Sequence, residues 1–196
     1  MRRSFICLAA LLSVSLAFSG CGRKRVQRIG LDEQIDLSGR WNATDSRLVS
    51  QEMITDALER PWLDNFIESE GQQPAVIVGN IVNRTDEHIV TETFTKDLER
   101  AFVNSGKVQV VASVEEREQV RTERMDMQEW ASEDTVAEFM REIGADYMLT
   151  GSVNSIIDRE GRQKVIYYQV NLELIHTATN RKSWIGEKQI KKYIRG

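Results

Sequence analysis

Cysteine, histidine and proline are scarce in this sequence, with two of each among 196 residues. Both cysteines, Cys7 and Cys21, lie near the amino terminus, so the chain after Cys21 has no thiol that could form a disulfide. A zinc site usually takes three or four protein ligands, chiefly Cys and His. We therefore expect no metal site, no disulfide and no thiol catalysis.

Motifs that position catalytic groups are also missing. The sequence contains no G-x-S-x-G, P-loop, G-x-G-x-x-G or H-E-x-x-H pattern. His88 and His176 stand apart in expected loops or strand ends, and acidic pairs such as Glu115-Glu116 begin expected helices, where they complement the helix dipole. We expect no enzyme, no cofactor and no small-molecule substrate.

Positive charge is sparse in the body of the chain. From Ile29 to Gly196 there are 20 Lys and Arg against 30 Asp and Glu. Affinity for nucleic-acid phosphates requires a basic surface. An acidic chain of this kind is therefore not expected to bind nucleic acid.

The amino terminus has the order of a secretory signal. Arg2 and Arg3 precede an apolar stretch from Phe5 to Phe18, and Ser19-Gly20-Cys21 follows. As a helix, these fourteen residues would be about 21 Å long. A helix that crosses a bilayer needs ~20 residues, so this stretch is too short to span one. We expect residues 1–20 to be removed as a signal peptide.

The residues Phe18-Ser19-Gly20-Cys21 resemble the bacterial lipobox, in which signal peptidase II cuts before a cysteine whose sulfur carries diacylglycerol. This resemblance implies that Cys21 is lipidated and that acyl chains such as palmitate anchor the mature protein. The residue after the cysteine is Gly22 rather than Asp. In lipoproteins of diderm bacteria, the absence of Asp at this position resembles a sorting signal for the outer membrane. A plain signal peptide that happens to end at a cysteine is the alternative.

Residues 21–44 are expected to form a short tether, which has four bases between Gly22 and Arg28 and no proline. As a flexible coil, residues 22–44 would span about 27 Å on average. The bases could contact anionic lipid headgroups or belong to a solvated linker, and the sequence leaves both interpretations open.

Residues 45–196 are expected to form one domain, since 41% of the chain is hydrophobic and 29% is charged. Apolar spacing predicts a helix after Thr44-Asp45-Ser46, which can cap it, and Pro61 is expected to interrupt this helix. The same spacing predicts a second helix over 90–102. A capping box at 113–116 opens a charged helix to about Trp130, and another helix follows Ser132 and ends at Gly144. The predicted strands cover 74–82, 108–111, 146–157, 164–175 and 183–191. This order predicts an α/β fold with a mixed β-sheet flanked by helices and a carboxy-terminal β-meander.

Several stretches resemble the penicillin-binding-protein activator lipoproteins of the LpoB type. They are Leu37 to Asn42, Val76 to Thr85, Asn104 to Lys107 and Gly144 to Gly151. Their order and spacing carry the resemblance, which covers most of the chain from Leu37 onward. It implies a fold similar to the amino-terminal domain of the translocation protein TolB.

This resemblance also implies a function. Proteins of this type are outer-membrane lipoproteins whose periplasmic domain activates a bifunctional class A penicillin-binding protein and so regulates peptidoglycan synthesis. Better-known members have a long proline-rich tether, whereas residues 22–44 contain no proline, so the identity of the partner stays open. Our candidate partner contacts lie in two segments: Arg40, Trp41 and Asn42, and Asn83, Arg84 and Thr85. Trp and Arg are the residue types that dominate interface energetics. The alternatives are that Trp41 folds back on the domain and that Asn83 caps a helix starting near Glu87.

Two alternatives remain at this point. A secretion or assembly lipoprotein similar to CsgG shares a lipobox and an α/β core, although it needs paired amphipathic hairpins to build a membrane barrel. An envelope enzyme such as a peptidoglycan hydrolase is the other alternative, against which the missing catalytic motifs argue.

Overall fold

The structure is a computed structural model that describes residues 27–28, 30, 33, 38–128 and 144–195. The chain divides into two compact units, Met1–Glu33 and Gln34–Gly196, and the fold described below is that of the second unit. Cys21 with its lipobox, the end of the charged helix at residues 129–130 and the helix expected between Ser132 and Ile143 lie outside the described residues.

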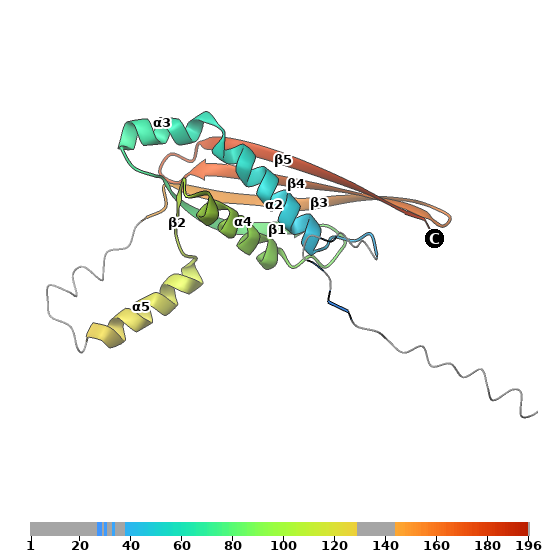
Figure 1. The fold of residues 1–196 in the computed structure, drawn as a ribbon, viewed down its shortest axis with the longest axis horizontal. Coiled ribbons are helices and arrows are strands. Elements are labelled where there is room, and N and C mark those ends of the chain that lie inside the picture. The colour runs from blue at the N-terminus through green and yellow to red at the C-terminus, as the bar shows by residue number, and fades with distance from the viewer. Residues whose placement is uncertain (1–26, 29, 31–32, 34–37, 129–143, 196) are drawn as a thin grey trace, which may run out of the picture. The chain divides into compact units, whose positions relative to one another are not determined.

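A mixed five-stranded sheet organises the second unit (Figure 1). Its strands are β1 (Ala75–Arg84), β2 (Gln109–Val110), β3 (Tyr147–Glu160), β4 (Gln163–His176) and β5 (Lys182–Arg195), in the spatial order β2-β1-β3-β4-β5. Strand β1 runs parallel to both β2 and β3, whereas β3, β4 and β5 are antiparallel neighbours. The expected mixed sheet with a carboxy-terminal meander is confirmed.

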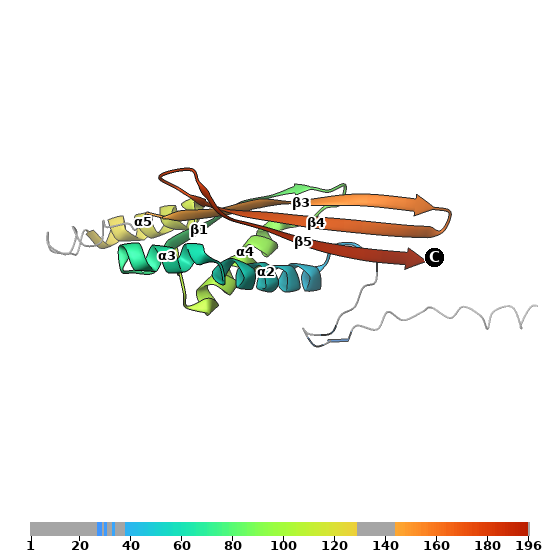
Figure 2. The ribbon, with the colours of Figure 1, turned by 90° about the horizontal axis from the view of Figure 1, so that it is seen from above.

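Helices α2 (Ala43–Leu58), α3 (Pro61–Glu70) and α4 (Thr91–Ser105) lie on one face of the sheet (Figures 1 and 2). The break between α2 and α3 falls where Pro61 occupies the first turn of α3, a position at which its missing N–H costs nothing. The cap of α2 differs from the prediction. Asn42, rather than Thr44-Asp45-Ser46, is the N-cap, because its side chain accepts hydrogen bonds from the Thr44 and Asp45 amides.

The hydrophobic core lies between these helices and the sheet. Strand β4 supplies alternate side chains that are fully buried, as expected for one face of a strand covered by helices. Helix α4 contributes residues at helical spacing, also fully buried. These core residues are Ile166, Tyr168, Val170, Leu172 and Leu174 from β4, and Phe94, Leu98 and Phe102 from α4. Among the described residues, the core cluster runs from Val49 to Trp184, so this core belongs to the second unit.

Helix α5 (Val114–Gln128) is joined to the rest of the unit by polar contacts. Its capping box is confirmed, because the Ser113 amide donates to the Glu116 carboxylate at 2.9 Å and the Glu116 amide donates to Ser113 Oγ at 3.2 Å. The same carboxylate pairs with Lys96 of α4 at 2.6 Å. This charged helix is therefore attached through its first turn.

Candidate functional site

The two segments predicted to contact a partner, residues 40–42 and 83–85, meet at Glu87. The backbone N–H of Trp41 donates to Glu87 Oε2 at 3.3 Å. On the other side, Asn83 Nδ2 donates to the Glu87 carbonyl at 2.8 Å. Residues distant in sequence therefore form one continuous hydrogen-bonded site, for which Glu87 supplies both the carboxylate and the carbonyl.

Tyr168 of β4 holds this site to the core. Its hydroxyl donates to Glu87 Oε2 at 2.6 Å and accepts from the Trp41 N–H at 3.0 Å. Burial, reinforced by the neighbouring Glu87 carboxylate, raises the pKa of Tyr168 above its usual value. The phenol therefore remains protonated and continues to donate at physiological pH.

Trp41 packs back onto the domain. Its indole Nε1 donates to Ser46 Oγ at 2.8 Å, and its ring meets those of Phe94 and Tyr168 edge to face, with centroids 6.0 and 5.6 Å apart. Edge-to-face pairs at such distances are favourable. The Trp41 side chain therefore holds the segment before α2 against the core.

Asn42 and Asp45 cap the start of α2 reciprocally. Asn42 Oδ1 accepts from the Thr44 and Asp45 amides, and Asp45 Oδ2 accepts from the Asn42 N–H at 2.9 Å. The Asp45 carboxylate also accepts from Lys192 Nζ at 2.6 Å, and this lysine donates to the Arg40 carbonyl at 3.1 Å. Arg40 itself is exposed.

The second segment forms a compact turn at the end of β1, whose last two residues are Asn83 and Arg84. Asn83 Oδ1 accepts from both the amide and the hydroxyl of Thr85, at 2.9 and 2.8 Å, which is the geometry of an Asx turn. Arg84 lies between them with an exposed side chain and no ion pair to any residue that the structure describes. The turn therefore presents Arg84 to the solvent while its two neighbours hold the backbone.

All six residues are predicted as partner contacts, and the structure places four of them, Trp41, Asn42, Asn83 and Thr85, in hydrogen bonds within the domain. Sequence reasoning missed Glu87 and Tyr168, the two residues that connect the segments. Glu87 follows β1 in a run of polar residues, and Tyr168 has the alternating pattern of any buried strand residue. Nothing in the local sequence distinguishes either one, since their pairing joins positions 81 residues apart.

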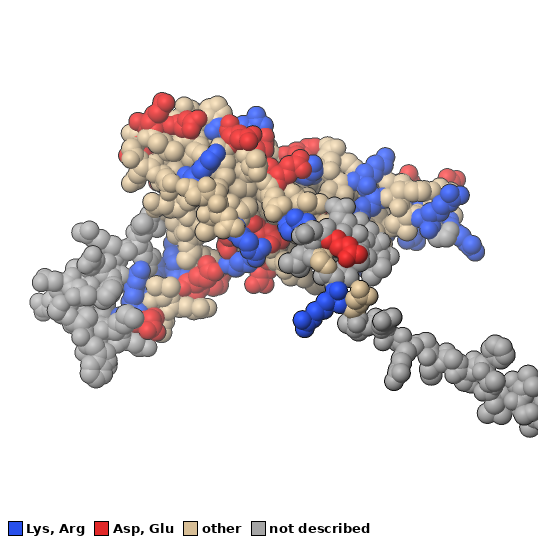
Figure 3. Space-filling view, in the orientation of Figure 1, with Lys and Arg blue, Asp and Glu red and all other residues tan. Residues whose placement is uncertain are grey.

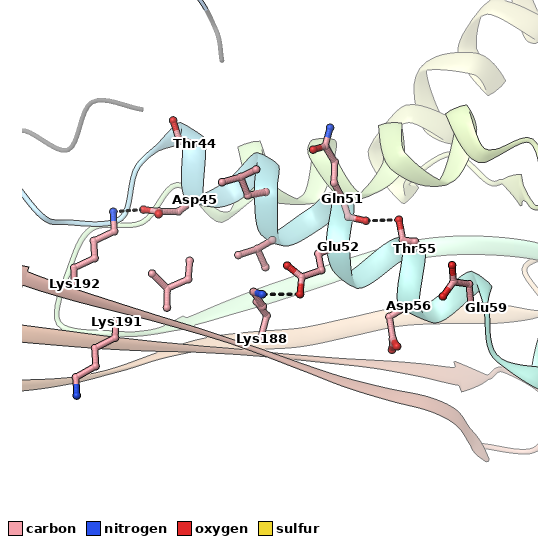
Figure 4. A pocket seen from close by; sticks show the side chains of 13 residues that line it. Thr44, Asp45, Gln51, Glu52, Thr55, Asp56, Glu59, Lys188, Lys191 and Lys192 are labelled. Carbon is pink, nitrogen blue, oxygen red and sulfur yellow. Dashed lines mark hydrogen bonds and ion pairs between the residues drawn. The ribbon is translucent and has the colours of Figure 1, made fainter. Parts of the chain in front are cut away.

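A groove of about 820 Å³ runs between α2 and β5 (Figure 4). Acidic side chains line it from the helix and lysines from the strand, with Lys188 paired to Glu52 and Lys192 to Asp45, each at 2.6 Å. Figure 4 shows Lys191 pointing away from α2 on the opposite side of the strand. Most charges in the groove are thus already paired within the chain.

Asp56 occupies the far end of this groove. It accepts hydrogen bonds from Arg60 and, at 2.8 Å, from the indole of Trp184. The Arg60 hydrogen bond, followed by that from Trp184, holds the pKa of Asp56 below its usual value. Asp56 is therefore ionised at neutral pH and serves to tie α2 to β5.

Within the part of the chain that the structure describes, no three His, Cys, Asp or Glu side chains gather as metal ligands would. None of the described helices is long and apolar enough to cross a membrane.

A family model described as the peptidoglycan-synthase activator LpoB matches residues 45–190. The chain belongs to the LpoB family. No curated protein matches the chain significantly. The match spans most of the described unit, from the first turn of α2 to the middle of β5.

Solved structures similar to this LpoB-family chain include the LpoB C-terminal domain from Salmonella enterica, with 19% identity, a TM-score of 0.42, and coverage of 74% of this chain and 98% of that one. The NMR structure of E. coli LpoB has 17% identity, a TM-score of 0.39, and coverage of 89% and 82%. A lipoprotein from Neisseria meningitidis has 14% identity, a TM-score of 0.39, and coverage of 61% and 83%.

Proposed function

We propose that this protein is an outer-membrane lipoprotein, anchored through Cys21, whose periplasmic domain binds and activates a bifunctional class A penicillin-binding protein. The observation that carries the proposal is the family match over residues 45–190 to a peptidoglycan-synthase activator. The signal-like segment 1–20 and the lipobox-like Phe18–Cys21 support the anchor.

Activation of this kind requires binding and no chemistry by the activator itself. An activator raises the turnover of a synthase by binding its active conformation more tightly than its resting one. To multiply the active fraction of a mostly resting synthase tenfold, the two affinities must differ by at least tenfold, which is about 1.4 kcal/mol. A few well-placed contacts can supply this difference.

The proposed contact surface is the site at Glu87. Arg40 and Arg84 are its exposed members, and an exposed guanidinium can form two parallel hydrogen bonds with a carboxylate of a partner. We assign the contacts to these two arginines. Trp41, Asn42, Asn83 and Thr85 complete the site by holding the backbone that presents them.

The test mixes residues 34–196 with each class A penicillin-binding protein of the same genome and follows polymerisation of lipid II. The expected result is saturable binding and faster polymerisation. No binding and no stimulation with any of these synthases contradicts the proposed function.

A second comparison tests the contact surface. Arg40→Ala combined with Arg84→Ala is expected to weaken binding at least tenfold. The matched control is Arg100→Ala combined with Lys107→Ala, which removes two exposed bases from the α4 region and is expected to leave binding unchanged. Equal affinities for the two double variants would show that the contacts lie elsewhere.

A further inference from the structure

The free end of the sheet forms a basic arm, which we define as residues 156–166 and 190–195 of β3, β4 and β5. Figures 1 and 2 show these strand ends projecting beyond helix α2. The arm contains six Lys and Arg and two acids, whereas the remainder of the unit 34–196 has 14 bases and 26 acids. Figure 3 shows Lys and Arg gathered at this end. The arm therefore carries a net positive charge, whereas the remainder of the unit carries a net negative charge.

Most of these bases are not used to stabilise the fold. Among the residues that the structure describes, Arg159, Arg162, Lys164, Lys191 and Arg195 have no ion-pair partner, in contrast to Lys188 and Lys192 in the α2–β5 groove. Arg159 and Lys164 even lie directly opposite each other across the hairpin. Like charges opposite each other destabilise a sheet, so the arrangement is explained better by an external ligand than by folding.

Apolar side chains accompany the bases on the arm. Ile156 is 67% exposed and Tyr193 is 58% exposed, and both lie on the face of the sheet opposite the helices. Val165 is paired with Tyr193 on the same face. Lys191 and Arg195 share this face, as does Asp158, whereas Arg159 and Lys164 lie on the other face of the sheet. The arm thus presents Lys and Arg on both faces and exposed Ile and Tyr on one. This combination fits the interface of a lipid bilayer, where rings and aliphatic groups lie at headgroup depth and bases meet phosphates.

The chain enters the domain beside this arm. Gly39 has a positive φ of 67°, and a Cβ added there would collide with the Ile194 side chain of the arm. Lys192 of the arm donates to the Arg40 carbonyl. Residues 39 and 40 therefore lie at the arm. Sixteen residues, the number from 22 to 37, span at most about 55 Å when fully extended.

We infer that the basic arm docks on the anionic phospholipid headgroups of the membrane in which the protein is anchored. This inference rests on the lipid anchor of the proposed function, which confines the arm to that surface. Docking orients the domain with its arm toward the bilayer and leaves α3 and the opposite end of the sheet facing away from it. Each Lys or Arg near an anionic bilayer raises the affinity by roughly fivefold.

The test uses residues 34–196, which contain the core described above and lack both the anchor and the bases before Gly30. Binding to sedimented vesicles that mix phosphatidylcholine with phosphatidylglycerol is compared with binding to vesicles of pure phosphatidylcholine. We expect binding to the anionic vesicles only. The arm variant Arg159→Gln, Arg162→Gln, Arg195→Gln is expected to lose about 100-fold in affinity.

The matched control is Arg100→Gln, Lys107→Gln, Arg181→Gln, which removes the same charge from exposed positions outside the arm. It is expected to change the affinity less than threefold. Equal losses in both variants, or no binding of the parent domain to anionic vesicles, would overturn the inference.

A second readout locates the contact. The unit 34–196 contains no cysteine, so Tyr193→Cys and Val103→Cys can each carry a single environment-sensitive fluorophore. Both positions are 58% exposed. We expect a blue shift on anionic vesicles at position 193 alone, and a shift at both positions or neither contradicts docking through the arm.

The polymerisation assay separates this inference from the proposed function. If the domain stimulates a synthase in detergent but does not bind vesicles, the proposed function stands and membrane docking is refuted. If the arm variant loses stimulation in detergent, the arm binds a protein instead, which also refutes membrane docking. If the domain binds vesicles but stimulates no synthase, the proposed function is refuted and docking through the arm stands.

Discussion

At the scale of single residues, Tyr168 connects the amino-terminal segment to the core. Its hydroxyl both donates to Glu87 and accepts from the Trp41 amide. Because the side chain is fully buried, water cannot replace these hydrogen bonds.

We therefore expect Tyr168→Phe to lower the free energy of unfolding by about 1–2 kcal/mol, the usual cost of leaving buried polar groups without a partner. Urea denaturation monitored by tryptophan fluorescence measures it. Tyr193→Phe is the matched control, since Tyr193 is largely exposed, and is expected to change stability by less than about 0.5 kcal/mol. Equal effects would indicate that the Tyr168 hydroxyl contributes nothing specific to stability.

At the scale of elements, α2 is held to β5 by two ion pairs of different burial. The side chains of Lys192 and Asp45 are 9% and 10% exposed, whereas those of Lys188 and Glu52 are 33% and 60% exposed. Removing one partner from a buried pair leaves an uncompensated charge, and an exposed pair is worth little because water screens it.

Lys192→Met is accordingly expected to destabilise the domain by about 3 kcal/mol, and Lys188→Met by less than about 1 kcal/mol. Thermal or urea unfolding measures both. The double variant Lys192→Met, Asp45→Asn should recover part of the loss, because no carboxylate then remains buried. A double variant no more stable than Lys192→Met would show that the isolated charge is not the cause.

The contact between α4 and α5 depends on pH. Lys96, followed by the Ser113 amide, lowers the pKa of Glu116 below its ordinary value of 4.5. A carboxyl with a lowered folded pKa stabilises the folded state above its unfolded pKa, and this contribution is lost as pH falls through the folded value. The window of loss therefore lies below about pH 4.5.

In an NMR titration of the side-chain carboxyl carbons, the midpoint for Glu116 in the parent protein should lie below the ordinary pKa of 4.5. The Lys96→Gln variant should raise the midpoint toward 4.5 because the charged partner is gone, and Lys188→Gln, which alters a distant pair, should leave it in place. An unchanged Glu116 midpoint in Lys96→Gln would mean that this pair does not form in solution.

At the scale of the whole molecule, the arrangement of charge complements the proposed anchor. The domain is acidic, its arm has six bases against two acids, and residues 39 and 40 lie beside that arm. An anchor upstream of residue 38 would therefore bring the basic end, rather than the acidic remainder, toward an anionic surface.

The anchor itself gives a prediction. Cys21→Ser is expected to abolish incorporation of labelled palmitate and to remove the mature protein from the outer-membrane fraction, because serine lacks the sulfur to which diacylglycerol is joined. Cys7→Ser should retain both, since Cys7 lies within the expected signal peptide. Label that persists in Cys21→Ser would exclude this residue as the lipidated one.

Local patterns predicted most of the elements of the domain. The spacing of Phe94, Leu98 and Phe102 predicted α4, Pro61 predicted the break after α2, and the Ser113–Glu116 capping box predicted the start of α5. Two of the β-strands were predicted too short: β5 continues beyond Lys191 to Arg195, and β3 beyond Ile157 to Glu160. Strand β2 was predicted too long, since it covers only Gln109–Val110. The end of β3, Asp158-Arg159-Glu160, lacks the apolar signal of a strand, and the ends of both strands are held by pairing with β4.

The sequence by itself determined the order of helices and strands, the mixed sheet with its meander and the resemblance to the LpoB family, because each rests on residues close together in the chain. Only the tertiary structure decided that Glu87 and Tyr168 unite the two candidate segments, that Asn42 caps α2, and that the bases of β3, β4 and β5 form one arm. These features depend on strand register and on contacts between residues far apart in sequence, and local periodicity carries no information about either.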